Sequence, residues 1–360
     1  MRPATLTINL THLANNYHLL QQQAGNAEIM AVVKANAYGH GLLSIAKALY
    51  QVGCRSFAVT DTREGTALRL GLTSDAHITL LSGIFNIDDA QQCVEHQLTP
   101  VCIQYTQLNM LQEAGFQGSI WLKVDTGMRR LGVNNIAELT HSVSQSPFQL
   151  AGIMSHLACA DTPPHPLNQT QFARFQQIQS STHAPAYSLL NSAGLIAFPQ
   201  YTYDIVRLGL ALYGIEPIST QPLGLKPVAE LSSQIIQIQK VKQGESVSYG
   251  ASWMAPHDMN IAVVALGYAD GLPRLLSNKG KACVNGHLLS IVGRVCMDYC
   301  MLAVENDAVV EGDKVVFFGE ESNQPSANHI AAQCQTIAYE VLTNLDRRLN
   351  RIYIGENHDE

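Results

Sequence analysis

The first two thirds of the chain alternate between short apolar runs and longer amphipathic segments. Eight runs rich in valine, isoleucine and leucine are apolar almost throughout, which is typical of strands covered on both faces. The expected strands are Glu28–Lys34, Arg55–Thr60, His77–Ser82, Pro100–Ile103, Ser119–Asp125, Leu150–His156, Pro185–Asn191 and Tyr203–Arg207.

Amphipathic segments lie between these runs. In Thr11–Ala24, for example, Leu13, Tyr17 and Leu20 fall on one face at helical spacing. The other expected helices are His40–Val52, Thr62–Leu72, Ile87–His96, Thr106–Ala114, Ile136–Ser144 and Gln169–Ser180. Strand and helix in repeated alternation predict an α/β fold, a (β/α)8 TIM-like barrel over residues 1–224. An open, doubly wound sheet is the main alternative, because periodicity alone does not separate the two.

The pattern changes after about Gly224, where strand-like segments follow one another with turn signals such as Asn285-Gly286 between them. The expected strands are Ser232–Val241, Asn260–Leu266, Lys281–Val284, Leu288–Val295, Cys300–Val304 and Lys314–Phe318. Only Ala327–Gln333 and Thr336–Thr343 are expected to be helical. We therefore expect residues 225–360 to form a second, mostly β domain.

Composition narrows the class of protein. Hydrophobic residues make up 46% of the 360 positions and charged residues 14%, which favours a well-packed globular protein. The net charge is −7 without a basic run, so nucleic acid is not an expected partner. No signal peptide or membrane-spanning stretch is evident, and we expect a cytoplasmic protein. The eight cysteines lack metal-ligand spacing, so we expect reduced core residues and no metal site.

Polar side chains end several of the expected strands, and in a barrel these ends form the active-site face. They are Lys34, Asp125, His156, Asn191 and Arg207, from five different strands. A lysine at a desolvated strand end has a lowered pKa and can act as a nucleophile that forms a Schiff base. A strand-terminal lysine that reaches into solvent is the plainer alternative.

The segment around this lysine, A-V-V-K-A-N-A-Y-G-H-G from Ala31 to Gly41, closely resembles the cofactor-lysine signature of bacterial alanine racemases, a pyridoxal-phosphate-dependent barrel family of fold type III. The resemblance continues in order along nearly the whole chain. The further matching segments are Lys123–Gly132, Ser155–Ala158, Asn191–Ala193, Val206–Gly214, Val247–Ala251, Gly267–Gly271, Gly293–Asp298 and Ala338–Glu340.

The resemblance implies a two-base racemisation. Lys34 would hold pyridoxal 5'-phosphate and act as one acid/base group, and Tyr249 from the second subunit of a homodimer would act as the other. One base removes the Cα proton and the other returns a proton to the opposite face. His156 would lie beside Tyr249 and favour its phenolate, while Arg207 would donate to the pyridine nitrogen of the cofactor.

The resemblance also assigns residues to the ligands. Six positions would bind the cofactor in addition to those above: Tyr38, Asn191, Ser192, Gly209, Leu210 and Tyr339. For Ser192 and Gly209, a helix N-cap and a tight turn are the plainer readings, both compatible with phosphate at a helix start.

The substrate carboxylate would be bound by Arg130 and by the backbone N–H of the partner subunit's Met297. Bulky Met297 and Tyr339 would crowd the side-chain pocket and favour alanine. Lys123 matches a position that is often carbamylated in the family. Asp161, Tyr268, Arg274 and Arg294 would line the entrance to the site, although both arginines are equally compatible with plain surface charges.

The chain departs from the family pattern in two places. Arg129 stands where a small or amide residue is usual, beside Arg130, and residues 346–351 lack the expected prolines.

The leading interpretation is an alanine racemase that supplies D-alanine for peptidoglycan or degrades it. A fold-related decarboxylase is a second enzyme hypothesis, disfavoured because a glycine-triplet phosphate loop is absent from the sequence. A non-catalytic pyridoxal-phosphate-binding protein is a third, and a purely structural barrel a fourth.

Overall fold

The computed structural model describes residues 2–305, 309–345 and 347–355. Its contacts divide the chain into two compact units. One unit, the barrel unit, consists of Leu13–Ala37 and Gly41–Leu225. The other, the sheet unit, contains residues 2–12, 38–40 and the described residues from 226 onward. Asp346, the first residue of the proline-free run, lies outside the described residues.

The barrel unit is built on eight parallel strands in the order β8-β7-β6-β5-β4-β3-β2-β9. They are β2 (Glu28–Val32), β3 (Ser56–Val59), β4 (His77–Leu80), β5 (Thr99–Cys102), β6 (Ser119–Lys123), β7 (Gln149–Met154), β8 (Tyr187–Ser188) and β9 (Ile205–Leu208). Backbone bonds from Asp204 to Tyr187 (3.2 Å) and from Arg207 to Leu190 (3.0 Å) join β9 to the end of the row, so the ring closes.

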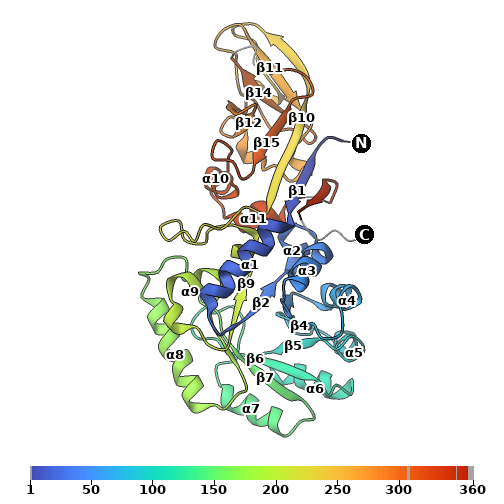
Figure 1. The fold of residues 1–360 in the computed structure, drawn as a ribbon, viewed down its shortest axis with the longest axis vertical. Coiled ribbons are helices and arrows are strands. Elements are labelled where there is room, and N and C mark those ends of the chain that lie inside the picture. Colours follow the sequence, from blue (N-terminus) through green and yellow to red (C-terminus); the bar gives the residue numbers. More distant parts are fainter. Residues whose placement is uncertain (1, 306–308, 346, 356–360) are drawn as a thin grey trace. The chain divides into compact units, whose positions relative to one another are not determined.

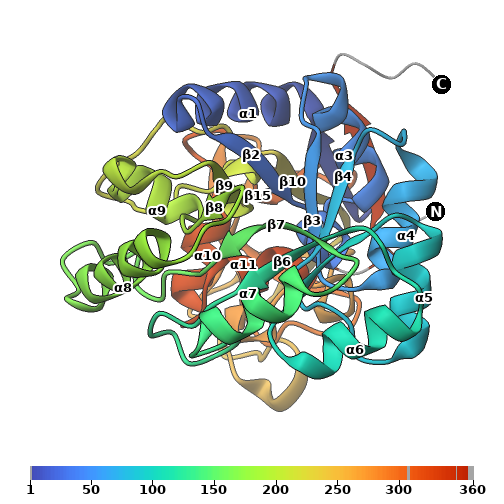
Figure 2. The same cartoon turned by 90° about the horizontal axis from the view of Figure 1, so that it is seen from below.

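Helices surround this ring, as Figures 1 and 2 show. They are α1 (Leu10–Ala24), α3 (Leu42–Gln51), α4 (Thr62–Gly71), α5 (Ile87–Glu95), α6 (Tyr105–Glu113), α7 (Ile136–Ser144), α8 (Leu167–Ser181) and α9 (Ser192–Ala197), with the 3-10 turns η1 (Pro199–Tyr201) and η2 (Leu210–Tyr213). All eight predicted strands are therefore present in parallel order, and the predicted (β/α)8 barrel is confirmed.

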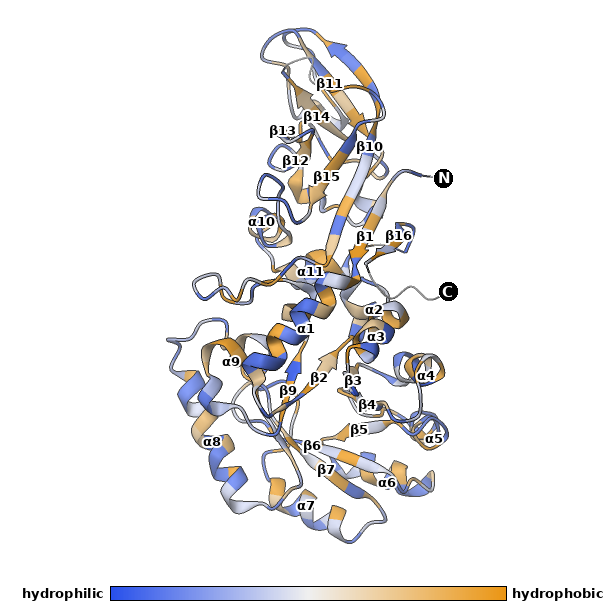
Figure 3. Ribbon diagram, in the orientation of Figure 1, coloured by the Kyte–Doolittle hydropathy of each residue, from blue (hydrophilic) through white to orange (hydrophobic). Residues whose placement is uncertain are grey.

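The local sequence explains why these elements form. The strands bury both faces: all four residues of β3 are buried, as expected for a sheet covered by helices outside and packed side chains inside. The helices bury one face: α3, for example, buries Ile45, Ala46, Ala48 and Leu49. Figure 3 shows hydrophobic and hydrophilic residues along the same helices. Several begin at a capping side chain; Asp61, for example, accepts the N–H of Glu64 at the start of α4.

The sheet unit contains a second eight-stranded sheet. Its strands are β1 (Thr5–Asn9), β10 (Ala229–Val241), β11 (Met259–Val264), β12 (Lys281–Val284), β13 (His287–Ser290), β14 (Cys300–Val304), β15 (Lys314–Phe318) and β16 (Asn350–Ile354). Its helical elements are α10 (Ala327–Gln333), α11 (Ala338–Thr343), η3 (Tyr249–Ala251), η4 (Tyr268–Asp270) and η5 (Arg274–Leu276). Apart from β1 and β16, these pairings are antiparallel, and the prediction of a mostly β second domain is confirmed.

Several details differ from the sequence analysis. Strands β1 and β16 were not predicted, and because β1 pairs with both β10 and β16, residues 2–12 belong with the sheet unit. The strand predicted over Leu288–Val295 is wrong beyond Ser290. There Gly293 turns the chain at φ +70°, and its backbone lies so close to Val247 that a Cβ would be 2.7 Å from that carbonyl oxygen.

No helix within the described ranges is both long and apolar enough to span a bilayer.

Candidate active site

Lys34 begins a turn of left-handed backbone rather than ending the strand. Strand β2 ends at Val32. In the following segment α2 (Lys34–Tyr38), the residues Ala35, Asn36, Ala37 and Tyr38 all have φ between 52° and 55°. Left-handed conformation costs roughly 1–2 kcal/mol per residue for residues with a Cβ. Four consecutive residues in this region are strained backbone, which is often found at functional sites.

Specific hydrogen bonds hold this strained turn. The two carboxylate oxygens of Glu64, on α4, accept the backbone N–H groups of Asn36 (3.0 Å) and Thr60 (3.2 Å). The side-chain oxygen of Asn36 accepts the N–H of Leu42 at the start of α3 (2.9 Å). The lysine is thus presented from a backbone fixed to the two following helices.

Four basic side chains gather at the carboxyl ends of the barrel strands. Burial lowers the pKa of Lys34, and the Arg130 cation lowers it further, while Glu64 opposes the shift. Burial, followed by the cations of Arg207, Arg130 and Lys34, lowers the pKa of Lys123 to about 8. Neighbouring cations lower these two pKa values because the four basic groups lie close together. Their combined charge makes the mouth of the barrel electropositive, which suits an anionic ligand.

Arg207 is the most constrained of these cations. Its Nη1 donates to the Ser188 hydroxyl (2.6 Å), and its Nη2 donates to the backbone oxygens of Ser155 and Leu189. Burial lowers its pKa to about 10, so it remains a cation at neutral pH. Among the hydrogen bonds within the described ranges none uses Nε, so this fixed donor is left for a ligand.

His156 is neutral and of defined tautomer. Nη2 of Arg207 lies 3.2 Å from Nδ1 of His156, and because a guanidinium only donates, Nδ1 must be the acceptor. The proton of the imidazole is therefore on Nε2. Burial, reinforced by the cations of Arg207 and Lys123, lowers the pKa of His156 well below its ordinary value.

The predicted phosphate-binding residues of the barrel come together around the start of η2. Asn191 is the N-cap of α9, since its side-chain oxygen accepts the N–H of Gly194 (2.8 Å). The neighbouring Ser192 hydroxyl accepts the N–H of Gly209 (3.2 Å). Leu210 follows directly as the first residue of η2. Backbone N–H groups and a hydroxyl are thus concentrated in one place, as an anion site requires.

Arg130 lies at the end of a turn organised by Asp125. The Asp125 carboxylate accepts the N–H groups of Gly127 (2.7 Å) and Arg129 (3.2 Å). Arg129 adopts a φ of 58° in this turn and is exposed, as is Arg130. The extra cation that departs from the family pattern is therefore at the surface of the barrel mouth.

The remaining candidates lie mainly in the sheet unit, on segments that touch each other. The side chains of Tyr249 and Met297 are 72% and 53% exposed. The Arg294 guanidinium lies against Gly250, where a Cβ would be 2.9 Å from its Cζ. The backbone N–H of Tyr268 donates to Cys296 (2.9 Å). Tyr249, Tyr268, Arg294 and Met297 thus share one region of this unit.

Arg274 and Tyr268 line a cavity of about 600 Å³ together with Glu340. Next to Glu340 along the chain, the ring of Tyr339 lies 5.8 Å from that of Tyr38, and burial raises the pKa of Tyr38. Asp161, by contrast, is an exposed residue of the barrel unit, in the loop between β7 and α8.

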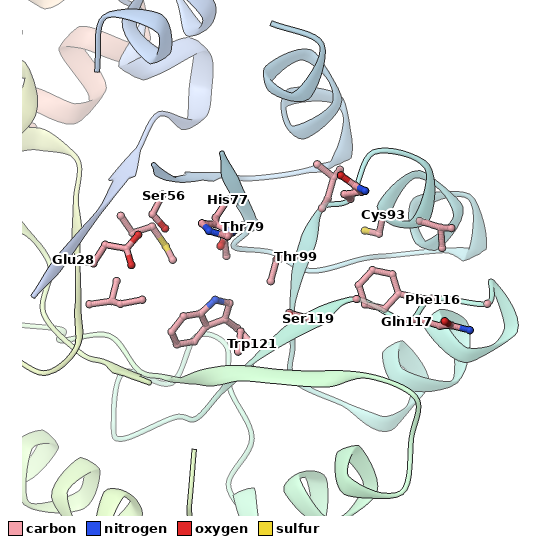
Figure 4. A pocket seen from close by; sticks show the side chains of 18 residues that line it. Glu28, Ser56, His77, Thr79, Cys93, Thr99, Phe116, Gln117, Ser119 and Trp121 are labelled. Atoms are coloured by element: carbon pink, nitrogen blue, oxygen red, sulfur yellow. The ribbon is translucent and has the colours of Figure 1, made fainter. Parts of the chain in front are cut away.

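A larger cavity, of about 710 Å³, lies at the other end of the barrel (Figure 4). Its lining includes Glu28, Ser56 and His77, each the first residue of its strand. None of the predicted site residues lines it. Because the basic cluster is at the opposite, carboxyl ends of the strands, we do not assign the chemistry to this cavity.

Sequence reasoning missed the residues that hold the candidates in place. Glu64 supports the turn after Lys34, and Ser188 receives a bond from Arg207. Ser188 lies in a predicted strand, three residues before Asn191, so its place in the barrel could be predicted from the sequence. Its hydrogen bond with Arg207 could not. A serine in an apolar strand was the only signal.

The order of these elements can be compared with known proteins. The family model described as alanine racemase, N-terminal domain, matches residues 8–217, and that described as alanine racemase, C-terminal domain, matches residues 228–353. The chain belongs to the alanine racemase family.

Individual members of the alanine racemase family are similar to this chain over nearly its whole length. The alanine racemase of Aliivibrio salmonicida is 36% identical, over 98% of this chain and all of its own. The crystal structure of the biosynthetic alanine racemase from Pseudomonas aeruginosa has a TM-score of 0.92 and 34% identity, covering 99% of this chain and 100% of its own. The alanine racemase from Bartonella henselae, with covalently bound pyridoxal phosphate, also has a TM-score of 0.92, with 32% identity, 98% of this chain and 100% of its own covered.

Proposed function

We propose that this protein is a pyridoxal-phosphate-dependent alanine racemase that interconverts L-alanine and D-alanine. The observation that carries the proposal is the electropositive mouth of the barrel, where Lys34 has a lowered pKa among Lys123, Arg130 and Arg207. A lysine that loses its proton more easily is a better nucleophile toward an aldehyde. The family relationship supports the same reaction.

The residues present fit pyridoxal phosphate. Lys34 offers an amine for the covalent link, and Nε of Arg207 is a fixed donor without a protein partner within the described ranges. The Ser192 hydroxyl and the backbone N–H of Leu210 would bind the phosphate, and so would the N–H of Gly209, which in this structure donates to the Ser192 hydroxyl. Tyr38, Asn191 and Tyr339 would complete the proposed cofactor site. When bound, the cofactor withdraws electrons from the substrate and so makes its Cα proton removable.

Two bases on opposite faces would then invert the substrate. Lys34 accepts or returns the Cα proton at Nζ on one face, and Tyr249 of the partner subunit does so at its hydroxyl on the other. With its proton on Nε2, neutral His156 can donate to that tyrosine oxygen and favour the phenolate. Arg207 fixes His156 through Nδ1, so one cation orients the histidine and the cofactor.

The proposal includes a homodimer with shared active sites. Tyr249 is 72% exposed in the single chain, and a base that transfers a proton to one face only must be shielded from water. A second copy covering Tyr249 and Met297 would supply that shield. The backbone N–H of the partner's Met297 and the guanidinium of Arg130 would bind the substrate carboxylate.

Substrate access and size complete the site. Bulky Met297 and Tyr339 would crowd the side-chain pocket, which would favour alanine over larger amino acids. Asp161, Tyr268, Arg274 and Arg294 would line the entrance. We also propose that the protein is cytoplasmic.

We propose that Lys123 is carbamylated. A neutral amine attacks carbon dioxide, forming an N–C bond and releasing one proton, and a pKa of about 8 leaves a neutral fraction at neutral pH. The product is an anion among the cations of Arg130, Arg207 and Lys34. It would replace a buried repulsion by an attraction and orient Arg130.

The decisive experiment combines absorption and optical rotation. The purified protein should be yellow from covalently bound cofactor and should drive L-alanine to an equal mixture of enantiomers. A yellow protein that releases carbon dioxide instead would support the decarboxylase hypothesis. A yellow protein that neither racemises L-alanine nor releases carbon dioxide would support the hypothesis of a non-catalytic cofactor-binding protein. A colourless protein that takes up no added cofactor would refute the proposal.

A further inference from the structure

A fully buried glutamine connects two strand ends of the barrel. Gln171 lies on α8, and its Nε2 donates to the backbone oxygen of His156 (2.8 Å) and to the Thr126 hydroxyl (3.1 Å). Its Oε1 accepts the N–H of Ala158 (2.9 Å). The amide therefore joins the segment after β7 to the segment after β6, with every polar atom of the side chain engaged.

The connection continues to Arg207. The Thr126 hydroxyl is 2.8 Å from that of Ser155, and the backbone oxygen of Ser155 accepts a bond from Nη2 of Arg207. On the other side of the guanidinium, Ser188 accepts from Nη1 and donates to the oxygen of Ile205 (2.7 Å). A chain of buried hydrogen bonds thus runs from α8 to the guanidinium.

We propose that Gln171 is a positioning residue for His156 and Arg207, holding the backbone from which both are oriented. The inference rests on the proposed function, in which these two side chains orient the cofactor and the second base. Displacements of about 1 Å in such groups can reduce rates on the order of 100-fold, although Gln171 itself touches neither ligand.

The energetics support this role. Replacing the amide by an apolar side chain would leave the part-buried His156 oxygen and the part-buried Ala158 N–H without this partner, and an unsatisfied polar group of this kind costs free energy. We expect the segment after β7 to relieve that cost by moving until the oxygen meets another donor and the N–H another acceptor, or until both meet water. Because His156 is in this segment, its imidazole moves with it.

The chain offers a matched control on another helix. Gln107, on α6, is also buried; its Oε1 accepts the N–H of Ile103 (2.8 Å) and its Nε2 donates to the oxygen of Ile84 (3.1 Å). It connects the segments after β5 and β4 just as Gln171 connects those after β7 and β6. No candidate site residue lies in the segments it holds, so its loss has a similar structural cost without the functional one.

The test compares Gln171→Met with Gln107→Met, since methionine is close to glutamine in size but makes no comparable hydrogen bonds. Thermal unfolding measures the structural cost, which should be similar. The dissociation constant of pyridoxal phosphate, by fluorescence titration of the apo-protein, and kcat for alanine measure positioning. We expect both to worsen on the order of 10- to 100-fold in Gln171→Met only, with a smaller change in KM for alanine.

Equal losses of kcat and cofactor affinity in the two variants, or wild-type values in Gln171→Met, would overturn the inference. If Gln171→Met does not fold, Thr126→Val tests the same chain, because it removes only the hydroxyl between Gln171 and Ser155. Failure of the proposed function is distinguishable: a wild-type protein that binds the cofactor but does not racemise alanine refutes that function, while the comparison of cofactor affinities still tests Gln171.

Discussion

Nη2 of Arg207 donates to Nδ1 of His156 across 3.2 Å, and this single contact fixes the protonation state of the imidazole. Protonated His156 would present an N–H to a guanidinium that has only N–H groups to offer. The contact and the lowered pKa of His156, caused first by burial and then by the Arg207 cation, therefore agree.

We accordingly predict that His156 stays neutral at pH 6, with its proton on Nε2. Imidazole nitrogen chemical shifts in protein labelled with ¹⁵N-histidine report both charge and tautomer, and His156→Asn identifies the signal. Because the unfolded chain takes up a proton near pH 6.5 that the folded state resists, His156 should also lower stability as the pH falls below that value. An imidazolium signal for His156 at pH 6 would contradict this prediction.

A second prediction concerns Lys123, whose buried cation opposes folding. The difference between its ordinary pKa of 10.5 and about 8 corresponds to roughly 3 kcal/mol of unfolding free energy. That cost is fully present below pH 8, where both states are protonated, and is relieved as the pH rises toward 10.5 and the folded state loses its proton first.

Lys123→Met should therefore unfold at a higher temperature than the wild type at pH 7 in buffer free of carbon dioxide, and the advantage should shrink by pH 10. Lys47→Met, at an exposed position of α3, serves as the control and should show no such pH-dependent difference. Bicarbonate should reduce the advantage at pH 7, because carbamylation replaces the cation by an anion. A pH-independent difference for Lys123→Met would show that its burial carries no electrostatic cost.

The barrel was predictable because its strands are buried on both faces. A run such as Ser56–Val59 is apolar in sequence apart from Ser56 and is buried throughout in the structure. Strands β1 and β16 of the sheet unit were harder to predict. In β1 every second residue is buried, which is an alternation visible in Thr5–Asn9, but its pairing with β16, more than 300 residues away along the chain, is not a local property.

The candidate site shows the same limit. Lys34, His156 and Arg207 could be selected because strand ends of a barrel converge. The left-handed turn after Lys34 could not, because a short strand ending in lysine gives no sign of positive φ; only Asn36 is a residue that favours it. Gln171 also gave no signal, since a buried amide on an amphipathic helix looks like a surface position until its partners are known.

A third prediction tests that turn. Glu64→Ala removes the carboxylate that accepts the N–H groups of Asn36 and Thr60, so the strained backbone after Lys34 loses its support. Hydrogen bonds to a charged group contribute about 1.5–3 kcal/mol each, so a fall of several degrees in unfolding temperature is expected, together with weaker cofactor retention.

The neighbouring Arg63→Ala is the control for Glu64→Ala, since the Arg63 side chain is 91% exposed and its ion pair with Asp61 contributes little. Cofactor retention after dialysis, followed by absorption, gives the second readout. If Glu64→Ala is clearly less stable but retains the cofactor like the wild type, the turn after Lys34 does not need this carboxylate to support cofactor binding.

The last prediction concerns the two-base scheme. Enantiomers have equal free energies, so the equilibrium constant is one, and any variant must change kcat/KM equally in the two directions. Steady-state rates therefore cannot show which base is lost. Incorporation of solvent deuterium into unconverted substrate can, because it requires only the base that faces that enantiomer.

In the proposed scheme Tyr249 acts on L-alanine and Lys34 acts on D-alanine, so Tyr249→Phe would remove the first base and leave the second intact. Deuterium should therefore enter unconverted D-alanine faster than unconverted L-alanine in this variant. Tyr105→Phe, at an exposed tyrosine of α6, should behave like the wild type. Nuclear magnetic resonance of the recovered alanine measures both rates. Equal incorporation into the two enantiomers by Tyr249→Phe would mean that Tyr249 is not the second base, whatever the overall loss of activity.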